Sequence, residues 1–158
     1  MELPESVADD ETVVRGIPKS KVRATGAHHR AFKPAVGQRE TSVVRNLIGD
    51  DESKEHAAEP FQSERDPYLG VAVAIVADLR SLKAEVVDAR DAFLGHANVI
   101  HAYPSPDMSA PPPEEPEDAR ALEQADDYYK AVAQKFFFLG DPAPTLPGWS
   151  GEPMQRAV

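Results

Sequence analysis

Residues 67–104 read PYLGVAVAIVADLRSLKAEVVDARDAFLGHANVIHAYP, and this stretch decides the fold. Nearly every position of 69–76 is apolar, which is typical of a strand buried on both faces. Apolar residues spaced three or four apart then predict a short helix over 76–83. Segments 85–89 and 97–103 have the β-rich composition of strands, and a proline ends the second. The stretch therefore predicts a strand, a helix and two further strands.

The rest of the chain divides by composition. Residues 1–10 are acidic with few apolar side chains, so we expect them to be disordered. Residues 11–103 are expected to form one α+β core domain, in which TVVRGI at 12–17 and TSVVRNLI at 41–48 are two more predicted strands. The polar stretch that follows predicts only a short surface helix over 51–58.

Three segments follow the core. Residues 104–116 (PSPDMSAPPPEEP) form a Pro-rich linker with polyproline II character. The spacing of apolar residues over 117–139 predicts a helix that packs on the core and ends in a run of three phenylalanines, which we expect to contact the sheet. Residues 140–158 are an irregular tail with Trp149 as its candidate anchor. The predicted fold is α+β, with a small mixed β-sheet of four to five short strands and two packed helices.

Composition excludes several classes of protein. The chain has 158 residues and no cysteine, which removes disulfides, thiolate zinc sites and cysteine nucleophiles. The longest apolar run, 71–77, is far shorter than the roughly 20 residues needed to cross a bilayer. The chain opens on an acidic segment without an apolar signal sequence, so we expect a soluble, cytoplasmic protein without membrane contacts.

The net charge of −10 conceals a basic segment, residues 15–45, which holds eight of the 17 basic residues and one of the 27 acidic ones. One interpretation is internal compensation, in which acidic segments fold over it. The other is a recognition surface for phosphate or an acidic partner. The overall acidity argues against nucleic acid as that partner, because tight binding to it needs a large uncompensated basic face.

Histidines carry the remaining candidate chemistry. His28 and His29 are adjacent, and His96 and His101 lie within the motif GHANVIH, whose Asn98 offers a further hydrogen-bond donor. The spacing of His96 and His101 does not match a zinc-binding helix, and a hydrogen-bonded structural histidine is the favoured interpretation. No nucleophile elbow, phosphate loop or facing pair of carboxylates is present. The sequence therefore predicts no catalytic residue, no metal ligand and no cofactor.

The segments RGIP, AFKP, ETSVVR, YLGVAVAIVADLRS and GHANVIHAYP, in this order, resemble a group of small bacterial proteins that carries no established activity. The resemblance covers about residues 13–104. It implies that Ala31-Phe32, Ser42-Val43 and Gly95-His96-Ala97 form one shared surface.

The hypothesis that follows is a bacterial cytosolic accessory or binding protein that acts through protein–protein contacts, with the basic segment as its recognition surface. The alternative is a small histidine-dependent hydrolase or nucleic-acid-processing enzyme, with or without a metal. A third possibility is an obligate subunit that folds stably only with its partner. The candidate binding residues are Lys19, Lys21, Arg23, His28, His29, Arg30, His96, Asn98 and His101.

Overall fold

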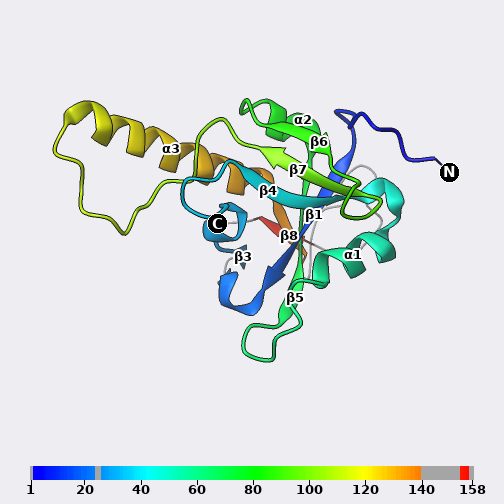
Figure 1. The fold of residues 1–158 in the computed structure, drawn as a ribbon. Helices are drawn as coiled ribbons and strands as arrows, with labels where there is room; N and C mark the ends of the chain where they lie inside the picture. The colour runs from blue at the N-terminus through cyan, green and yellow to red at the C-terminus, as the bar shows by residue number, and fades with distance from the viewer. Residues whose placement is uncertain (1, 24–25, 140–153, 157–158) are drawn as a thin grey trace.

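An antiparallel sheet organises the fold (Figure 1), which is seen in a computed structural model that describes residues 2–23, 26–139 and 154–156. Within these residues the sheet has seven strands in the order β6-β7-β4-β1-β5-β8-β9. The strands are β1 (Thr12–Pro18), β4 (Glu40–Arg45), β5 (Tyr68–Ile75), β6 (Glu85–Asp88), β7 (His96–Ile100), β8 (Phe137–Leu139) and β9 (Met154–Arg156). Strands β2 (Val22–Arg23) and β3 (Gly26–Ala27) form a separate small hairpin.

Three α-helices and three 3₁₀ turns complete the described chain. The helices are α1 (Asp50–Ala58), α2 (Val76–Arg80) and α3 (Pro116–Lys135), and the turns are η1 (Lys19–Lys21), η2 (His29–Phe32) and η3 (Asn46–Ile48). The α+β class is confirmed. The predicted mixed sheet of four to five strands is wrong in two respects, because every ladder is antiparallel and β8 and β9 extend the sheet. Neighbouring strands that all run in opposite directions need no parallel crossover connection.

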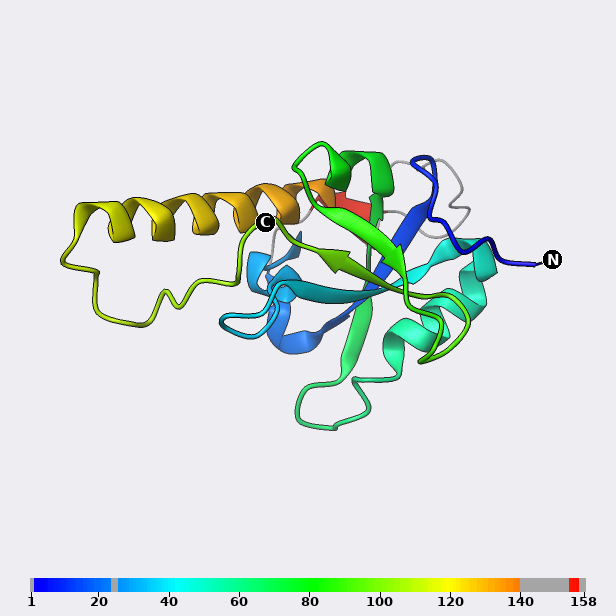
Figure 2. The same ribbon diagram turned by 45° about the horizontal axis from the view of Figure 1, so that its top comes forward.

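The two faces of the sheet are covered by different helices (Figure 2). Helix α1 covers one face, which we call the α1 face, and packs there on Val14, Val44, Val71 and Val73. Helices α2 and α3 with η2 cover the opposite face, which we call the α3 face, where the larger core cluster lies. Residues 71–74 of β5 are buried alternately in the cores of the two faces, as the sequence predicts, whereas Leu69 at the start of the strand is exposed.

The C-terminal helix ends earlier than predicted. Helix α3 stops at Lys135, and Phe136 has extended backbone angles of φ −93° and ψ 143°. Phe136 and Phe138 are buried in the core of the α3 face, whereas Phe137 packs on the α1 face. This alternation is the period of a strand, so burial on both faces of the sheet outweighs the helical pattern that precedes it. Strand β8 pairs with β5 through Val73 and Phe137.

The first half of α3 projects from the domain as an arm (Figures 1 and 2). All residues of 116–124 are exposed except the half-buried Leu122, whereas the buried residues of the helix begin at Ala125. The Pro-rich segment runs out to the tip of this arm and connects it to β7. The start of that segment is anchored, because the Ser105 amide donates to the Gln38 carbonyl and the Ser105 carbonyl accepts from the Gly37 amide.

The N-terminal segment, which we expected to be disordered, packs on the core. Leu3 and Val7 are buried, with 6% of each residue exposed. The backbone carbonyls of Pro4 and Ser6 accept hydrogen bonds from the Arg45 guanidinium. Two apolar anchors and a buried donor therefore hold a segment whose acidic composition predicts disorder. Trp149 lies outside the described residues, as does most of the predicted tail.

No helix in the described part of the chain is long and apolar enough to span a membrane.

Candidate functional site

The structure divides the basic segment into inward-facing and outward-facing residues. Arg45 is fully buried and donates to both carboxylate oxygens of Glu11 at 2.8 Å and to Asp88 at 2.8 Å. The Nζ atom of Lys33 lies 3.3 Å from Oδ1 of Asp126 in α3. These two residues confirm that part of the basic segment is compensated within the fold.

Among the other basic residues of the segment, the exposed Arg39 precedes β4, and three more lie at the surface on two turns that contact each other. Lys19 and Lys21 belong to η1 and Arg30 to η2, and none of them forms an ion pair with a described residue. Lys19 and Arg30 are exposed, and Lys21 is half-buried. We call these three residues the basic end of the domain. Arg23 lies in strand β2, and its side chain is outside the described part of the structure.

His28 and His29 lie beside the basic end. Their rings are 4.2 Å apart, and His28 Nδ1 accepts a hydrogen bond from the Arg30 amide, which caps η2. Burial lowers the pKa of His29 to about 4, and the charges of His28 and Lys33 add to this effect. His29 is therefore neutral at pH 7, and any permanent charge at this surface comes from lysine and arginine.

His101 is a structural histidine, as the favoured interpretation predicts. Its Nε2 lies 2.7 Å from the Thr41 hydroxyl and its Nδ1 lies 2.9 Å from the Tyr128 hydroxyl, inside the core of the α3 face. The Thr41 hydroxyl donates to the Phe32 carbonyl, and the Tyr128 hydroxyl accepts from the Ala102 amide. These partners fit one neutral tautomer, in which Nε2 donates and Nδ1 accepts. Burial and the charge of Arg15 lower the pKa of His101 to about 4.

His96 and Asn98 lie on the opposite face from His101. Both are on β7, where side chains alternate between the faces, and His96 Nδ1 lies 3.0 Å from the Ala89 carbonyl. The GHANVIH segment therefore does not bring His96 and His101 together. Among the described residues, no group of three histidine, aspartate or glutamate side chains is placed to hold a metal ion.

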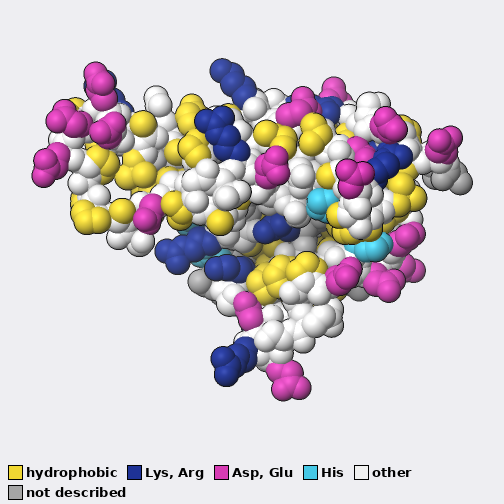
Figure 3. Space-filling view, in the orientation of Figure 1, with side chains coloured by type: hydrophobic (Ala, Val, Ile, Leu, Met, Phe, Trp, Pro, Cys, Tyr) yellow, Lys and Arg dark blue, Asp and Glu magenta, His cyan; other side chains and the backbone are white. Residues whose placement is uncertain are grey.

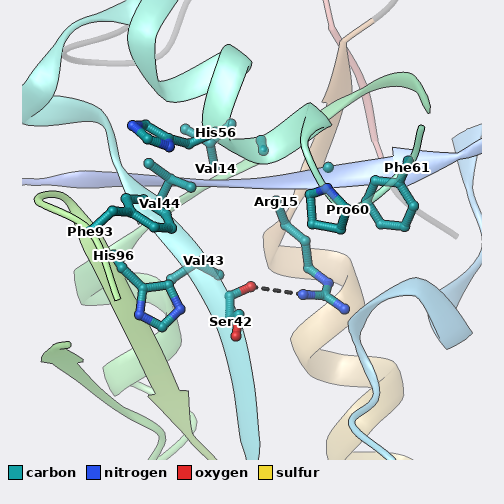
Figure 4. Close-up of a pocket in the computed structure, with 12 residues that line it drawn as sticks. Val14, Arg15, Ser42, Val43, Val44, His56, Pro60, Phe61, Phe93 and His96 are labelled. Carbon is teal, nitrogen blue, oxygen red and sulfur yellow. Dashed lines mark hydrogen bonds between the residues drawn. The ribbon is translucent and has the colours of Figure 1, made fainter. Parts of the chain in front are cut away.

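A cavity of about 350 Å³ opens between α1 and the sheet, next to His96 (Figure 4). Figure 3 shows the molecular surface hollowed in this region, with histidine and basic side chains at its rim. The described residues that line the cavity are Val14, Arg15, Gly16, Ser42, Val43, Val44, His56, Ala57, Pro60, Phe61, Phe93 and His96. None of these lining residues is acidic, and Arg15 is the one with a permanent charge.

Arg15 occupies a gap in the sheet. Strands β1 and β4 pair at Val13–Arg45 and Val14–Val44 and stop pairing after that, although each goes on pairing with its other neighbour. In the gap, Arg15 Nε donates to the Ala31 carbonyl at 2.6 Å and Nη1 donates to the Ser42 carbonyl at 2.7 Å. Among the described residues no carboxylate pairs with Arg15, and burial lowers its pKa to about 10.

Aromatic rings form one side of the cavity. The ring of His56 stacks on that of Phe93, with centroids 4.1 Å apart and planes 6° from parallel. The ring centroids of Phe93 and His96 are 5.1 Å apart. Figure 4 shows Pro60 and Phe61 on the other side of Arg15. The cavity therefore combines apolar walls with one half-buried cation.

Sequence reasoning missed this site. Arg15 was assigned to the basic segment as a whole, and His56 was not assigned a role. The available signal was the position of Arg15 inside TVVRGI, where a charge interrupts a strand predicted to lie in the core. The alternation of that strand indicates a buried arginine, but not what surrounds it.

Comparison with known proteins adds no relative, since no protein-family model, curated protein or solved structure matches the chain. Of the segments that resemble small bacterial proteins, Ala31, Phe32, Val43 and Ala97 lie in the core of the α3 face. Ser42, Val43 and His96 line the cavity on the α1 face. That these segments form one shared surface stays a prediction.

Proposed function

We propose that this protein is an accessory binding protein that recognises an acidic region of a protein partner through its basic end. The observation that carries the proposal is the contrast within one segment. Lys33 and Arg45 form ion pairs inside the fold, whereas Lys19, Lys21 and Arg30 form none with a described residue. The carboxylate of Asp66, which is hydrogen-bonded to Ser20 of η1, acts on Lys21 only from beyond ion-pair distance.

A net charge of −10 makes this contrast informative. An acidic chain has enough carboxylates to neutralise its surface cations, yet the cations of two adjoining turns form no ion pair with a described residue. Repulsion between like charges on neighbouring turns is unfavourable for an isolated domain. A partner surface of opposite charge would relieve that repulsion, steer association and orient the complex.

The projecting half of α3 adds support from a different element. A helical stretch with no packed face gains little stability from its own sequence, because most helical stability in proteins comes from tertiary packing. Residues 116–124 lack such packing within the described chain. The arm leaves the domain beside η2, so one partner could contact both the arm and the basic end.

The alternative of a histidine-dependent enzyme has less support. His101 forms two hydrogen bonds inside the core, His96 lies on the other face of the sheet, and the ring of His28 contacts that of His29 at a tilt of 31°. A catalytic pair needs two of these groups within hydrogen-bond reach of one substrate atom.

The test compares two matched double charge reversals. Lys19→Glu/Arg30→Glu changes the basic end, and Lys54→Glu/Lys83→Glu makes the same change in net charge on α1 and after α2, outside the basic end and the arm. Both variants and the wild type are used as bait for proteins of the host at low and high salt. The proposal expects a stoichiometric partner that only the first variant and high salt remove. A partner retained by Lys19→Glu/Arg30→Glu would overturn it.

A further inference from the structure

We infer that the cavity between α1 and the sheet binds a small carboxylate with an apolar body, and that Arg15 holds the carboxylate. This inference is independent of the proposed partner, because it concerns the α1 face and neither the basic end nor the arm. It follows from the donors that Arg15 leaves unused, from the charge that the cavity can neutralise, and from its walls.

Arg15 has more hydrogen-bond donors than the described residues use. A guanidinium group carries five N–H bonds, of which the carbonyls of Ala31 and Ser42 take one each. No described residue accepts a hydrogen bond from the other three. Arg15 is half-buried, and a charge that is partly removed from water without a counterion is costly, so a protein usually pairs it or removes it. A bound anion would supply the missing acceptors, and a carboxylate matches the two-pronged geometry of a guanidinium.

The charge of the cavity favours a carboxylate over a phosphate monoester. Arg15 is the one lining residue with a permanent charge, and it can neutralise a single negative charge. A phosphate monoester carries about −1.5 to −2 charges near pH 7 and would leave part of that charge unpaired among apolar side chains. A monocarboxylate leaves none.

The walls define the rest of the ligand. Val14, Val44 and Ala57 are buried side chains of the core on the α1 face, and the stacked rings of Phe93 and His56 lie opposite Pro60 and Phe61. A volume of about 350 Å³ is at the lower end of the range for small-molecule sites. The ligand class is therefore a compact aliphatic or aromatic monocarboxylate.

Three probes of similar size separate the possible outcomes. 3-Phenylpropionate carries the carboxylate, 3-phenylpropionamide is its uncharged counterpart, and phenyl phosphate replaces the carboxylate with a phosphate. Binding is followed by shifts of backbone amide signals in NMR titrations of the full chain. We expect 3-phenylpropionate to shift residues that line the cavity and to bind at least about tenfold tighter than either other probe.

Two variants locate the site. Arg15→Met removes the charge and should weaken binding of 3-phenylpropionate at least about tenfold. Because Arg15 also joins η2 to β4, a second variant, Ser42→Trp, blocks the cavity from an exposed position and leaves Arg15 in place. Ser81→Trp is the matched control, since Ser81 is exposed and does not line this cavity. It should bind the probe like the wild type.

Each other outcome overturns the inference. Equal binding of the acid and the amide would identify an apolar cavity in which Arg15 is only structural. Tighter binding of phenyl phosphate would assign the cavity to phosphate esters. Shifts that persist in Ser42→Trp would place the probe elsewhere, and the absence of shifts at millimolar 3-phenylpropionate would mean that the cavity does not take this class.

Discussion

Arg15 donates a 2.7 Å hydrogen bond from Nη1 to the backbone carbonyl of Ser42, across the point where β1 and β4 stop pairing. A side chain thus replaces the ladder between two central strands of the sheet. Strand β4 stays paired with β7 across this point. The gap between β1 and β4 lies beside the cavity under α1. The guanidinium group of Arg15 therefore borders a cavity at a position where backbone hydrogen bonds would ordinarily join the two strands.

Gly16 sets the distance between α1 and the sheet, and Gly16→Ala should destabilise the fold by about 3 kcal/mol or more. A Cβ atom at this position would collide with the backbone carbonyl of Ala57 and lie 2.9 Å from the ring of Phe61. Because the obstacle is helix backbone, it cannot be relieved by a change of rotamer. Urea denaturation at neutral pH measures the loss.

Gly37→Ala is the contrasting variant. A Cβ at Gly37 would meet nothing within 4 Å. The loss of unfolding free energy should therefore be about 1–2 kcal/mol, which is the cost of placing alanine at the left-handed φ of 82°. Equal stability of Gly16→Ala and wild type would show that α1 is not packed on β1 as described.

Arg45→Met should cost about 3–5 kcal/mol of unfolding free energy, because it leaves the buried carboxylate of Glu11 without its partner. Asp88 is less affected, since Arg90 also donates to it at 2.7 Å. The double variant Arg45→Met/Glu11→Gln should recover part of the loss, because the glutamine is uncharged and can still accept from the Ala8 amide. Strictly additive losses in this cycle would contradict a coupled buried pair.

His101 should make the fold less stable as the pH falls from about 6.5 to about 4. Its pKa in the folded protein is about 4, below the value of 6.5 expected after unfolding, so in this range the unfolded chain binds a proton that the folded chain does not. The stability that His101 contributes is fully present above pH 6.5 and is lost toward pH 4, with an upper limit of about 3 kcal/mol. NMR titration of the His101 ring, together with denaturation at several pH values, measures both quantities.

Other groups titrate in distinguishable ways. His29 shifts in the same direction but is only partly buried, so the variant His29→Asn should keep most of the pH dependence. Burial raises the pKa of Asp88, but hydrogen bonds from Arg90 and Arg45 outweigh this effect and hold the pKa below its usual range. The stability that Asp88 contributes is therefore lost only below about pH 4. A His101 ring that titrates near pH 6.5 would contradict the core network with Thr41 and Tyr128.

Local patterns predicted most of the fold. The alternation and apolar runs that mark β1, β4, β5, β6 and β7, and the helical spacing that marks α2 and α3, depend on burial at short range. Strand direction and the pairing partner of β8 depend on contacts far apart in the sequence, which one chain does not reveal. The sequence pattern of 136–138 is compatible with both a helix and a strand, and tertiary packing decides which of the two forms.

The candidate sites were predicted less well, for a physical reason. Charge in a sequence is visible, but its compensation is not, so Arg15, Lys33 and Arg45 could not be told apart from Lys19, Lys21 and Arg30. Their partners, among them Glu11, Asp88 and Asp126, come from segments distant in the chain. The cavity was invisible because it arises where two strands separate.

The salt dependence of the captured complex tests the proposed function most directly. Calorimetry of the wild type with its purified partner should show the dissociation constant rising about tenfold or more between about 50 and 300 mM salt, because exposed charges are screened. Lys19→Glu/Arg30→Glu should bind weakly at every salt concentration, and Lys54→Glu/Lys83→Glu should follow the wild type. A complex whose affinity is the same at all salt concentrations, or is unchanged by reversal of Lys19 and Arg30, would contradict recognition through the basic end.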